Sequence, residues 1–368
     1  MAVFGTRPEA IKMAPVVNRL QDDDICEVRV CLTGQHREML DQFVKIFDLR
    51  VDYDLNVMRE NQTLTDVTSN VLIGMEKVFA QWKPDCVLVQ GDTTTTFAAA
   101  LAAFYHKIKV GHVEAGLRTY HRYSPFPEEM NRCLVSELAS MHFAPTQCSR
   151  QNLIEEGIDS EDIFVVGNTV IDALYCALEH INKNTELSEE LGRQFQFLDH
   201  HKKLILVTGH RRENHGEGFC SICQALHDVA LRGDVQIVYP VHLNPNVKKT
   251  VYEMLKDLSD VYLIEPLDYL SFTYLMRESY LIVTDSGGVQ EEASSLGKPL
   301  LVMRDTTERM EAIDAGTALL VGPGRDAIVQ NVTRLLDDQA TYEKMSLTQN
   351  PYGDGRAAER IIEALRKR

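Results

Sequence analysis

The chain carries little positive charge for its size, which argues against several classes of partner. Its 368 residues include 38 Lys and Arg against 54 Asp and Glu, giving a formal net charge of −16 at pH 7. Nucleic acids and anionic membrane surfaces are bound through clustered basic side chains. We therefore expect no nucleic-acid partner and no membrane partner.

The sequence also lacks long apolar runs and a secretory signal. No stretch approaches the ~20 apolar residues of a membrane-spanning helix, and no signal peptide opens the chain. The eight cysteines are scattered, mostly inside apolar segments, in a chain much longer than disulfide-stapled secreted domains. These features predict a cytoplasmic protein with reduced, mostly structural cysteines.

Several common cofactor motifs are missing or incomplete. There is no Walker A sequence and no His-Glu-x-x-His, and Cys220 and Cys223 lack the second pair of a zinc site. The segment 322–327, Gly-Pro-Gly-Arg-Asp-Ala, matches a loose dinucleotide fingerprint. Because no later strand ending in an acidic residue completes that unit, we expect only a turn there.

Short β-branched runs alternate with longer segments of helical period, which is typical of parallel sheets wrapped by helices. Strands are expected at 28–32, 86–89, 110–113, 164–166, 204–207, 236–239, 262–264, 280–283, 300–303 and 319–321. Helices are expected to include 8–20, 37–47, 63–82, 94–105, 128–140, 220–231, 289–296 and 356–366.

The chain length favours two domains, and the alternating series restarts after Gly167-Asn168-Thr169. We expect an N-terminal Rossmann-like domain at 1–168 and a C-terminal Rossmann-like domain at 169–355, each with a doubly wound sheet. The last helix, within 356–368, is expected to pack back on the first domain.

Reactive side chains gather where the expected strands end. These segments are Gly5-Thr6-Arg7-Pro8-Glu9, Gly34-Gln35-His36-Arg37, Gly91-Asp92-Thr93, His112-Val113-Glu114-Ala115-Gly116, Gly209-His210-Arg211-Arg212-Glu213, Asp285-Ser286-Gly287-Gly288 and Arg304-Asp305-Thr306. Ligands of open parallel sheets bind outside the carboxyl ends of the strands. Loops are polar in any protein, but the recurrence of Arg, His and Glu beside Gly favours ligand clefts.

The segment 285–288 opens a helix directly after an apolar strand. A helix N-terminus offers free N–H groups and partial positive charge, and its glycines let a phosphate approach the backbone. A diphosphate fits there, and Glu292, one turn later, could accept both ribose hydroxyls. The alternative is an ordinary turn with a helix cap.

Three carboxylates are candidates for acid–base chemistry: Asp92, Glu114 and one of Glu128 or Glu129. Moving a proton at an unactivated carbon requires donors and acceptors on the faces where protons move. Asp92 could instead cap a helix, and a glutamate after Pro127 could instead complement a helix dipole.

Basic side chains near the same segments would hold an anionic leaving group. The candidates are Arg7, Lys12, His210, Arg211, Arg212 and Arg309. Surface ion pairs and a solvated helix lysine are the alternatives.

Taken together, these segments resemble the bacterial non-hydrolysing UDP-N-acetylglucosamine 2-epimerases. The matching stretches run through the whole chain: 3–15, 34–37, 91–95, 111–119, 127–129, 208–213, 284–288, 304–309 and 350–355. The resemblance implies an α/β, GT-B-like fold, with two Rossmann-like doubly wound parallel-sheet domains facing each other across a cleft.

The resemblance also implies an isomerase that reversibly converts UDP-N-acetylglucosamine to UDP-N-acetylmannosamine without NAD, metal or other cofactor. UDP would be eliminated to leave 2-acetamidoglucal and would then add back after reprotonation at C2. A homodimer that serves cell-surface polysaccharide synthesis is expected on the same grounds.

Residue by residue, the resemblance assigns catalytic roles to Asp92, Glu114, Glu128 and His210. It assigns substrate binding to Arg7, Lys12, Arg211, Leu267, Phe272, Ser286, Gly287, Gly288, Glu292 and Arg309, with Leu267 and Phe272 packing uracil. Some relatives use a second, activating UDP-N-acetylglucosamine site, to which Gln35, His36 and His242 would correspond. Glu38 and Asn61 stand where some of those relatives carry Gln and Arg.

Three other functions are alternatives to a non-hydrolysing epimerase. A hydrolysing epimerase would release UDP and free N-acetylmannosamine. A GT-B glycosyltransferase would need an acceptor site and often a basic, membrane-facing lobe, which this acidic sequence does not indicate. A non-catalytic nucleotide-sugar sensor would not need all three carboxylates.

Overall fold

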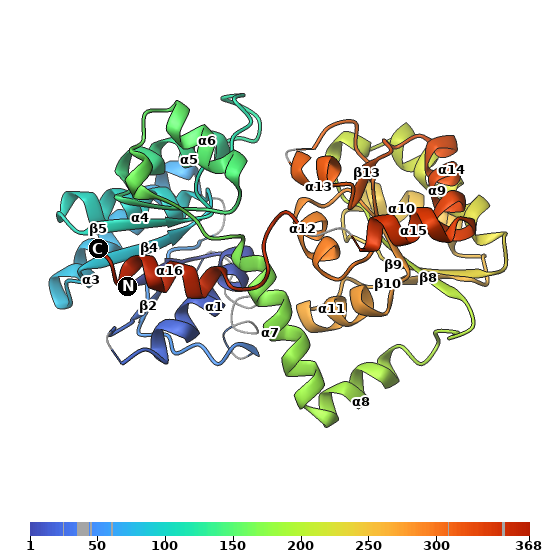
Figure 1. Ribbon diagram of the computed structural model, residues 1–368, viewed down its shortest axis with the longest axis horizontal. Coiled ribbons are helices and arrows are strands. Elements are labelled where there is room, and N and C mark those ends of the chain that lie inside the picture. The colour runs from blue at the N-terminus through green and yellow to red at the C-terminus, as the bar shows by residue number, and fades with distance from the viewer. Residues whose placement is uncertain (25, 35–43, 45, 60–61, 308, 348–349) are drawn as a thin grey trace. The chain divides into compact units, whose positions relative to one another are not determined.

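The computed structural model describes residues 1–24, 26–34, 44, 46–59, 62–307, 309–347 and 350–368. Contacts divide them into two compact units (Figure 1): unit 1 is Met1–Ala173 with Tyr352–Arg368, and unit 2 is Leu174–Pro351. Each unit contains its own parallel sheet wrapped by helices, so the α/β class predicted from the alternating pattern is confirmed.

The described part of unit 1 forms a seven-stranded parallel sheet. Its strands are β1 (Ala2–Phe4), β2 (Val30–Leu32), β3 (Tyr53–Asp54), β4 (Cys86–Gln90), β5 (Lys109–Val113), β6 (Met141–Ala144) and β7 (Ile163–Val165). The spatial order is β3-β2-β1-β4-β5-β6-β7. The chain therefore winds outward in both directions from the β1/β4 pair, which is the topological switch point where ligands bind in such sheets.

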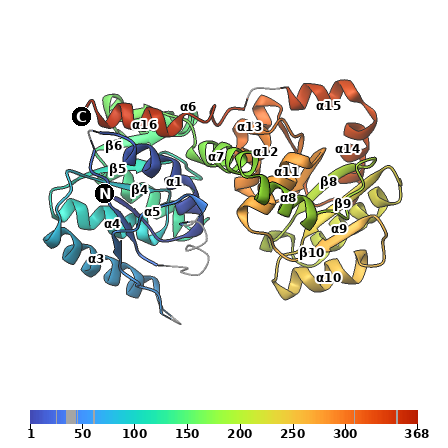
Figure 2. The same cartoon turned by 90° about the horizontal axis from the view of Figure 1, so that it is seen from below.

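Helices cover both faces of this sheet (Figure 2). They are α1 (Arg7–Gln21), α3 (Leu64–Gln81), α4 (Thr94–Tyr105), α5 (Glu128–Leu138), α6 (Gln147–Glu155), the 3-10 turn η1 (Ser160–Asp162), the start of α7 (Thr169–Lys183) and α16 (Ala357–Leu365). The last helix packs against α1. Buried Asp172 fixes its start by accepting the backbone N–H groups of Ala357 and Ala358 at 3.1 and 2.9 Å.

The described part of unit 2 forms a six-stranded parallel sheet of the same design. Its strands are β8 (Lys203–Thr208), β9 (Val235–Pro240), β10 (Val261–Ile264), β11 (Leu281–Thr284), β12 (Leu300–Val302) and β13 (Ala318–Leu320). The order β10-β9-β8-β11-β12-β13 places the switch point between β8 and β11.

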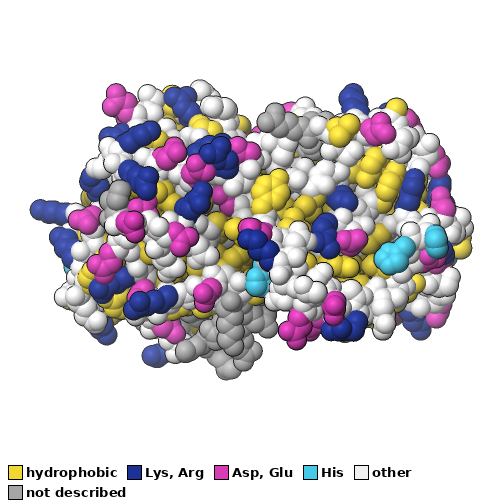
Figure 3. Space-filling view, turned by 60° about the horizontal axis from the view of Figure 1, so that its bottom comes forward, with side chains coloured by type: hydrophobic (Ala, Val, Ile, Leu, Met, Phe, Trp, Pro, Cys, Tyr) yellow, Lys and Arg dark blue, Asp and Glu magenta, His cyan; other side chains and the backbone are white. Residues whose placement is uncertain are grey.

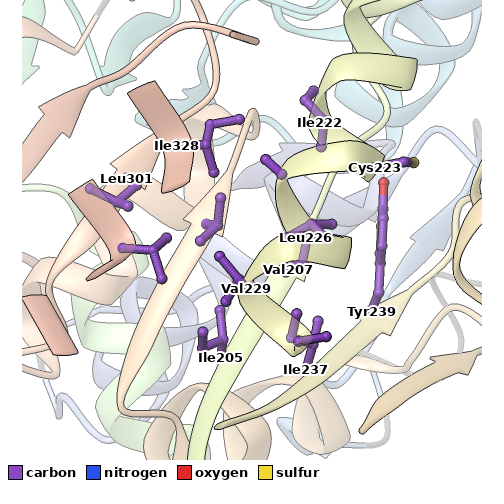
Figure 4. Packing of buried hydrophobic residues seen from close by; sticks show 14 of the residues in the cluster. Ile205, Val207, Ile222, Cys223, Leu226, Val229, Ile237, Tyr239, Leu301 and Ile328 are labelled. Atoms are coloured by element: carbon purple, nitrogen blue, oxygen red, sulfur yellow. The ribbon is translucent and has the colours of Figure 1, made fainter. Parts of the chain in front are cut away.

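The helices of unit 2 include α9, which covers the middle of the sheet. They are α8 (Thr185–Gln194), the 3-10 turn η2 (Arg212–Asn214), α9 (Glu217–Ala230), α10 (Pro245–Leu255), α11 (Tyr269–Glu278), α12 (Gly287–Ser295), α13 (Met310–Ala315), α14 (Arg325–Asp337) and α15 (Gln339–Ser346). In Figure 4, Cys223 and Leu226 of α9 lie among the core side chains of the sheet. Cys223 is therefore a core residue, and burial raises the pKa of its thiol to about 12.

Among the described residues, no helix is long and apolar enough to cross a membrane. On the face shown in Figure 3, acidic and basic side chains are interspersed. Three strands of the structure are missing from the expected series: β1, which has three residues, β3, which has two, and β6. The predicted helix at 37–47 falls almost entirely outside the described residues.

Candidate active site

In unit 1, the polar side chains singled out from the sequence follow strands at the switch point. Arg7 begins α1 after β1, Asp92 follows β4, and Glu114 follows β5. Glu114 has φ +65°, a conformation that is uncommon for a residue with a side chain and costs on the order of 1–3 kcal/mol. The tight turn after β5 therefore carries strain at the residue predicted to act on the substrate.

Glu114 is buried, and two donors hold its carboxylate. Lys12 of α1 and Gln90, the last residue of β4, both contact its Oε2 atom. Lys12 is mostly buried, so its ammonium group is directed at this carboxylate rather than being a solvated helix lysine. These donors fix the position of the Glu114 carboxylate.

Asp92 lies in a different environment from Glu114. Its side chain is one-third exposed, and Oδ2 forms an ion pair with Nη2 of buried Arg132 at 3.1 Å. Burial raises the pKa of Asp92; Arg132 opposes this shift, and the carboxylate of Glu114 adds to it, as does that of Glu128. Asp92 therefore holds a proton more readily than an ordinary aspartate.

The two glutamates at the start of α5 have separate environments. The buried Glu129 carboxylate accepts the backbone N–H groups of Thr119 and Tyr120 at 2.8–3.1 Å, so it stabilises the preceding loop. Glu128 is half-buried, and its charge acts on Asp92. No hydrogen bond of the Glu128 carboxylate occurs within the described part of the chain. Of the two, Glu128 is the one whose carboxylate is available to a substrate.

The turn that carries Asp92 is held from three sides. Thr93 caps α4 by accepting from the backbone N–H of Thr96 at 3.1 Å. The imidazole Nε2 of His112 lies 2.7 Å from the carbonyl oxygen of Gly91. Asn131 of α5 donates to the carbonyl oxygen of Asp92 at 2.9 Å. Neighbouring strands and helices thus position the carboxylate through its backbone.

In unit 2, the corresponding turn follows β8 and is held by fully buried Asp285. The Asp285 carboxylate accepts the backbone N–H groups of His210 and Arg211 at 3.0 and 2.9 Å, and the amide of Asn214 at 3.3 Å. Gly209 is needed here, because a Cβ atom would lie 2.8 Å from the hydroxyl of Tyr239. Asp285 therefore organises the loop after β8 rather than capping α12.

His210 itself is partly exposed beside Asp285, with 3.4 Å between Nδ1 and Oδ1. Its ring stacks on that of His242, with centroids 5.5 Å apart. Burial lowers the pKa of His210; the carboxylate of Asp285 opposes this, whereas Arg211 and His242 add to it. The lowered pKa disfavours the positively charged form of His210 that was expected from the sequence.

The N-terminus of α12 has the features expected of a phosphate site. Ser286 and Gly288 are half-buried, the Ser286 hydroxyl does not cap the helix, and a Cβ at Gly288 would meet nothing within 4 Å. One turn later, the buried Glu292 carboxylate accepts from the hydroxyl of Tyr269 at 3.0 Å. Backbone donors and a fixed carboxylate are therefore adjacent in the same helix.

Comparison with known proteins agrees with these features. The sequence model of the family described as UDP-N-acetylglucosamine 2-epimerase matches residues 18–366. The chain belongs to this family. Proteins named UDP-N-acetylglucosamine 2-epimerase from Yersinia pestis and Escherichia coli K12 are each 57% identical over 367 residues, covering 100% of this chain and 98% of theirs.

A solved structure supports the same relationship. The crystal structure of UDP-GlcNAc 2-epimerase from Neisseria meningitidis, bound to UDP-GlcNAc, superposes with a TM-score of 0.93 at 53% identity, covering 100% of this chain and 99% of that one. The family, the GT-B-like fold of two Rossmann-like sheets and the isomerase class predicted from the motifs are thus confirmed.

Other residues predicted for this epimerase site have varied surroundings. Arg309 is mostly buried and pairs with Glu291 at 2.8 Å. Leu267 precedes α11, Phe272 lies within it, and both are half-buried. Gln35 and His36 lie outside the described residues. In the described part of the chain, no group of His, Cys, Asp and Glu is arranged to hold a metal ion.

Three residues that position the epimerase carboxylates were not predicted: Gln90, Arg132 and Tyr269. Gln90 is a polar residue ending an apolar strand, a signal that could have been used. Arg132 lies one turn after Glu128 on α5, also visible in the sequence. Tyr269 joins Glu292 across a separation of 23 residues, which no local pattern indicates.

Proposed function

We propose that the chain interconverts UDP-N-acetylglucosamine and UDP-N-acetylmannosamine by eliminating UDP and adding it back, without net hydrolysis. The main support is the group formed by Asp92, Glu114 and Glu128 at one end of the unit 1 sheet, with a different environment for each carboxylate. Epimerisation at C2 requires one group to remove a proton and another to supply one, so groups of unequal basicity suit it.

Unit 2 would bind the nucleotide. The hydroxyl of Ser286 and the N–H groups at Gly287 and Gly288 would hold the diphosphate, and Glu292 would accept the ribose hydroxyls. Leu267 and Phe272 would pack against uracil. Arg211 and Arg309 would add positive charge, and His210 would donate a hydrogen bond to the departing phosphate.

Unit 1 would act on the sugar, with Arg7 adding positive charge. In the first step, the C1–O bond breaks and its electron pair leaves with UDP, so positive charge develops at C1. This charge acidifies the neighbouring C2–H bond, whose electrons then form the C1=C2 double bond of 2-acetamidoglucal while a base takes the proton. The carboxylates Glu114 and Glu128 would stabilise the developing positive charge.

In the second step, a proton is delivered to C2 on the opposite face and UDP adds back to C1. We assign proton removal in the forward direction to Glu114, because Lys12 and Gln90 hold its carboxylate in a fixed position. We assign proton delivery to Asp92, because its raised pKa favours the protonated form. The roles exchange in the reverse reaction, since both directions share one path.

Proton NMR of UDP-N-acetylglucosamine incubated with the purified protein tests this function. We expect UDP-N-acetylmannosamine to accumulate to equilibrium, with free UDP no greater than the amount of enzyme. A hydrolysing epimerase would instead release UDP and N-acetylmannosamine in equal amounts until substrate is exhausted. A glycosyltransferase or a sensor would leave the substrate unchanged when no acceptor is added.

Replacing Tyr269 by phenylalanine should weaken nucleotide binding without slowing chemistry. Tyr269 donates to buried Glu292, so its loss leaves that carboxylate less well positioned for the ribose. A hydrogen bond to a charged group contributes about 1.5–3 kcal/mol, which predicts a KM about 10- to 150-fold higher with kcat unchanged. Steady-state kinetics measure both values, with Tyr252→Phe on α10 as the control. A lower kcat at unchanged KM would contradict the assigned role.

A further inference from the structure

Unit 2 contains a cavity at the end of its sheet opposite to the loops of His210 and Asp285. Lys203, Gln236, Tyr280 and Lys298 line it, and they lie at or near the amino ends of β8, β9, β11 and β12. Its volume is about 520 Å³. Sites for small molecules usually measure about 300–1,000 Å³, so this cavity could enclose one. It is separate from the predicted UDP site, which follows the carboxyl ends of the strands.

Lys298 distinguishes this cavity from an ordinary polar hollow. Its ammonium group is half-buried and makes no hydrogen bond or ion pair with any described residue. The other two lysines of the cavity are engaged, Lys202 with Asp260 at 2.5 Å and Lys203 with the carbonyl oxygen of Leu336 at 2.7 Å. Burial lowers the pKa of Lys298, although the carboxylate of Glu278 opposes the shift. A bound anion would compensate for this lost hydration.

The remaining charged groups also favour an anion. His200 and His201 line the cavity beside its three lysines. The lining carboxylates already have donors: Asp199 accepts from the backbone N–H of His201 at 2.9 Å, and Glu278 accepts from Arg277 at 2.9 Å. The chain has a net charge of −16, so a cavity with this excess of basic groups is unusual in it and favours an anionic ligand.

Two aromatic pairs contribute to the walls. Phe195 and Tyr274 stack with centroids 5.7 Å apart and an interplanar angle of 14°. Tyr280 and Tyr342 stack at 4.1 Å and 20°. Because Lys203 lies over the Tyr280 ring at 4.3 Å and Arg277 over the Tyr274 ring at 4.9 Å, a bound flat ring would meet the edges of these tyrosines. Edge-to-face aromatic contacts add affinity beyond that of the charge alone.

We propose that this cavity binds a small anion that carries a flat ring, with a phosphate or carboxylate group at Lys298 and the ring against the aromatic side chains. The proposal concerns a site in addition to the one for the nucleotide sugar, and it does not depend on the epimerase mechanism.

Pyridoxal 5′-phosphate tests the site because it combines a phosphate, a flat ring and an aldehyde. The amine of Lys298 would attack the aldehyde carbon, water would leave, and borohydride would reduce the imine to a secondary amine that peptide mass spectrometry locates. The full chain is used without added UDP, which is itself an anion with a flat ring, and the peptide map separates label at Lys298 from label at the predicted nucleotide site. We expect Lys298 to be labelled at least about tenfold faster than exposed Lys256 of the same unit.

Pyridoxal, which lacks the phosphate, separates an anion site from a lysine that is merely reactive. If pyridoxal labels Lys298 with the same preference, or if Lys298 is labelled no faster than Lys256, the proposal is overturned. Phenyl phosphate and benzoate then compete with the probe, and protection by one of them identifies the preferred anionic group. Equal protection by inorganic phosphate and phenyl phosphate would refute the role of the ring, and protection by none of the three would refute the site.

Discussion

Replacing Glu114 by glutamine should lower kcat at least about 100-fold, the size of effect expected when a group moves a proton in the transition state. Glutamine has nearly the same shape, so Lys12 and Gln90 would still surround the side chain, but it cannot accept a proton from C2. The same reasoning predicts a similar loss for Asp92→Asn. Glu128→Gln should also lower kcat, because it removes a negative charge that would stabilise the developing positive charge at C1. Initial rates at saturating UDP-N-acetylglucosamine, followed by NMR, measure the effect.

The matched control is Glu137→Gln, an exposed glutamate on the same helix as Glu128, which should keep normal turnover. UDP affinity should be unchanged in all four variants, because none of them alters unit 2. If one of the three active-site variants retains kcat within about threefold of the original protein, that residue does not act in the transition state and loses its assigned role.

Acidification below pH 6.5 should destabilise unit 1 steeply, because two histidines are buried in neutral form on neighbouring strands. Burial lowers the pKa of His112 to about 3 and that of His142 to about 4, and Nδ1 of each ring has no partner in the described structure. In the unfolded chain both imidazoles titrate near 6.5, so below that pH the unfolded state binds protons that the folded state does not bind. Stability is then lost as pH falls.

The expected slope is about 1.4 kcal/mol per pH unit for each histidine, or about 3 kcal/mol for each between pH 6.5 and 4. Such a loss is large against a typical total stability of about 5–15 kcal/mol. Trp82, the only tryptophan of the chain, follows α3 in unit 1, so its fluorescence during urea unfolding reports on this unit. His142→Gln should reduce the slope by about half, whereas exposed His121→Gln should leave it unchanged. A stability of unit 1 that is constant from pH 7 to 4.5 would disprove the account.

Much of the fold could be predicted because parallel sheets leave two local signals, apolar strand runs and polar residues directly after them. The expected strands at 86–89 and 204–207 correspond to β4 (Cys86–Gln90) and β8 (Lys203–Thr208). β6 (Met141–Ala144) was missed because none of its residues, Met, His, Phe and Ala, has a β-branched side chain. β3 (Tyr53–Asp54) has too few residues to show any alternation.

The candidate site was predictable in part for the same reason. Asp92 and Glu114 follow strands, so their positions could be read from the sequence, and the structure places both at the switch point of unit 1. The choice between Glu128 and Glu129 depends on which carboxylate the backbone of residues 119 and 120 engages, which is a tertiary contact. The role of Asp285 in holding the loop after β8 could not be predicted either, because its partners His210 and Asn214 are more than 70 residues away in the sequence.

The central claim is that a proton leaves C2 and is replaced from solvent while UDP is detached. Incubation of UDP-N-acetylglucosamine with the protein in D2O, followed by NMR and mass spectrometry, tests it most directly. We predict that both UDP-N-acetylglucosamine and UDP-N-acetylmannosamine carry deuterium at C2 at equilibrium, and that no other carbon is labelled. Epimerised sugar that retains hydrogen at C2 would contradict the account, because it would show inversion without exchange of that proton.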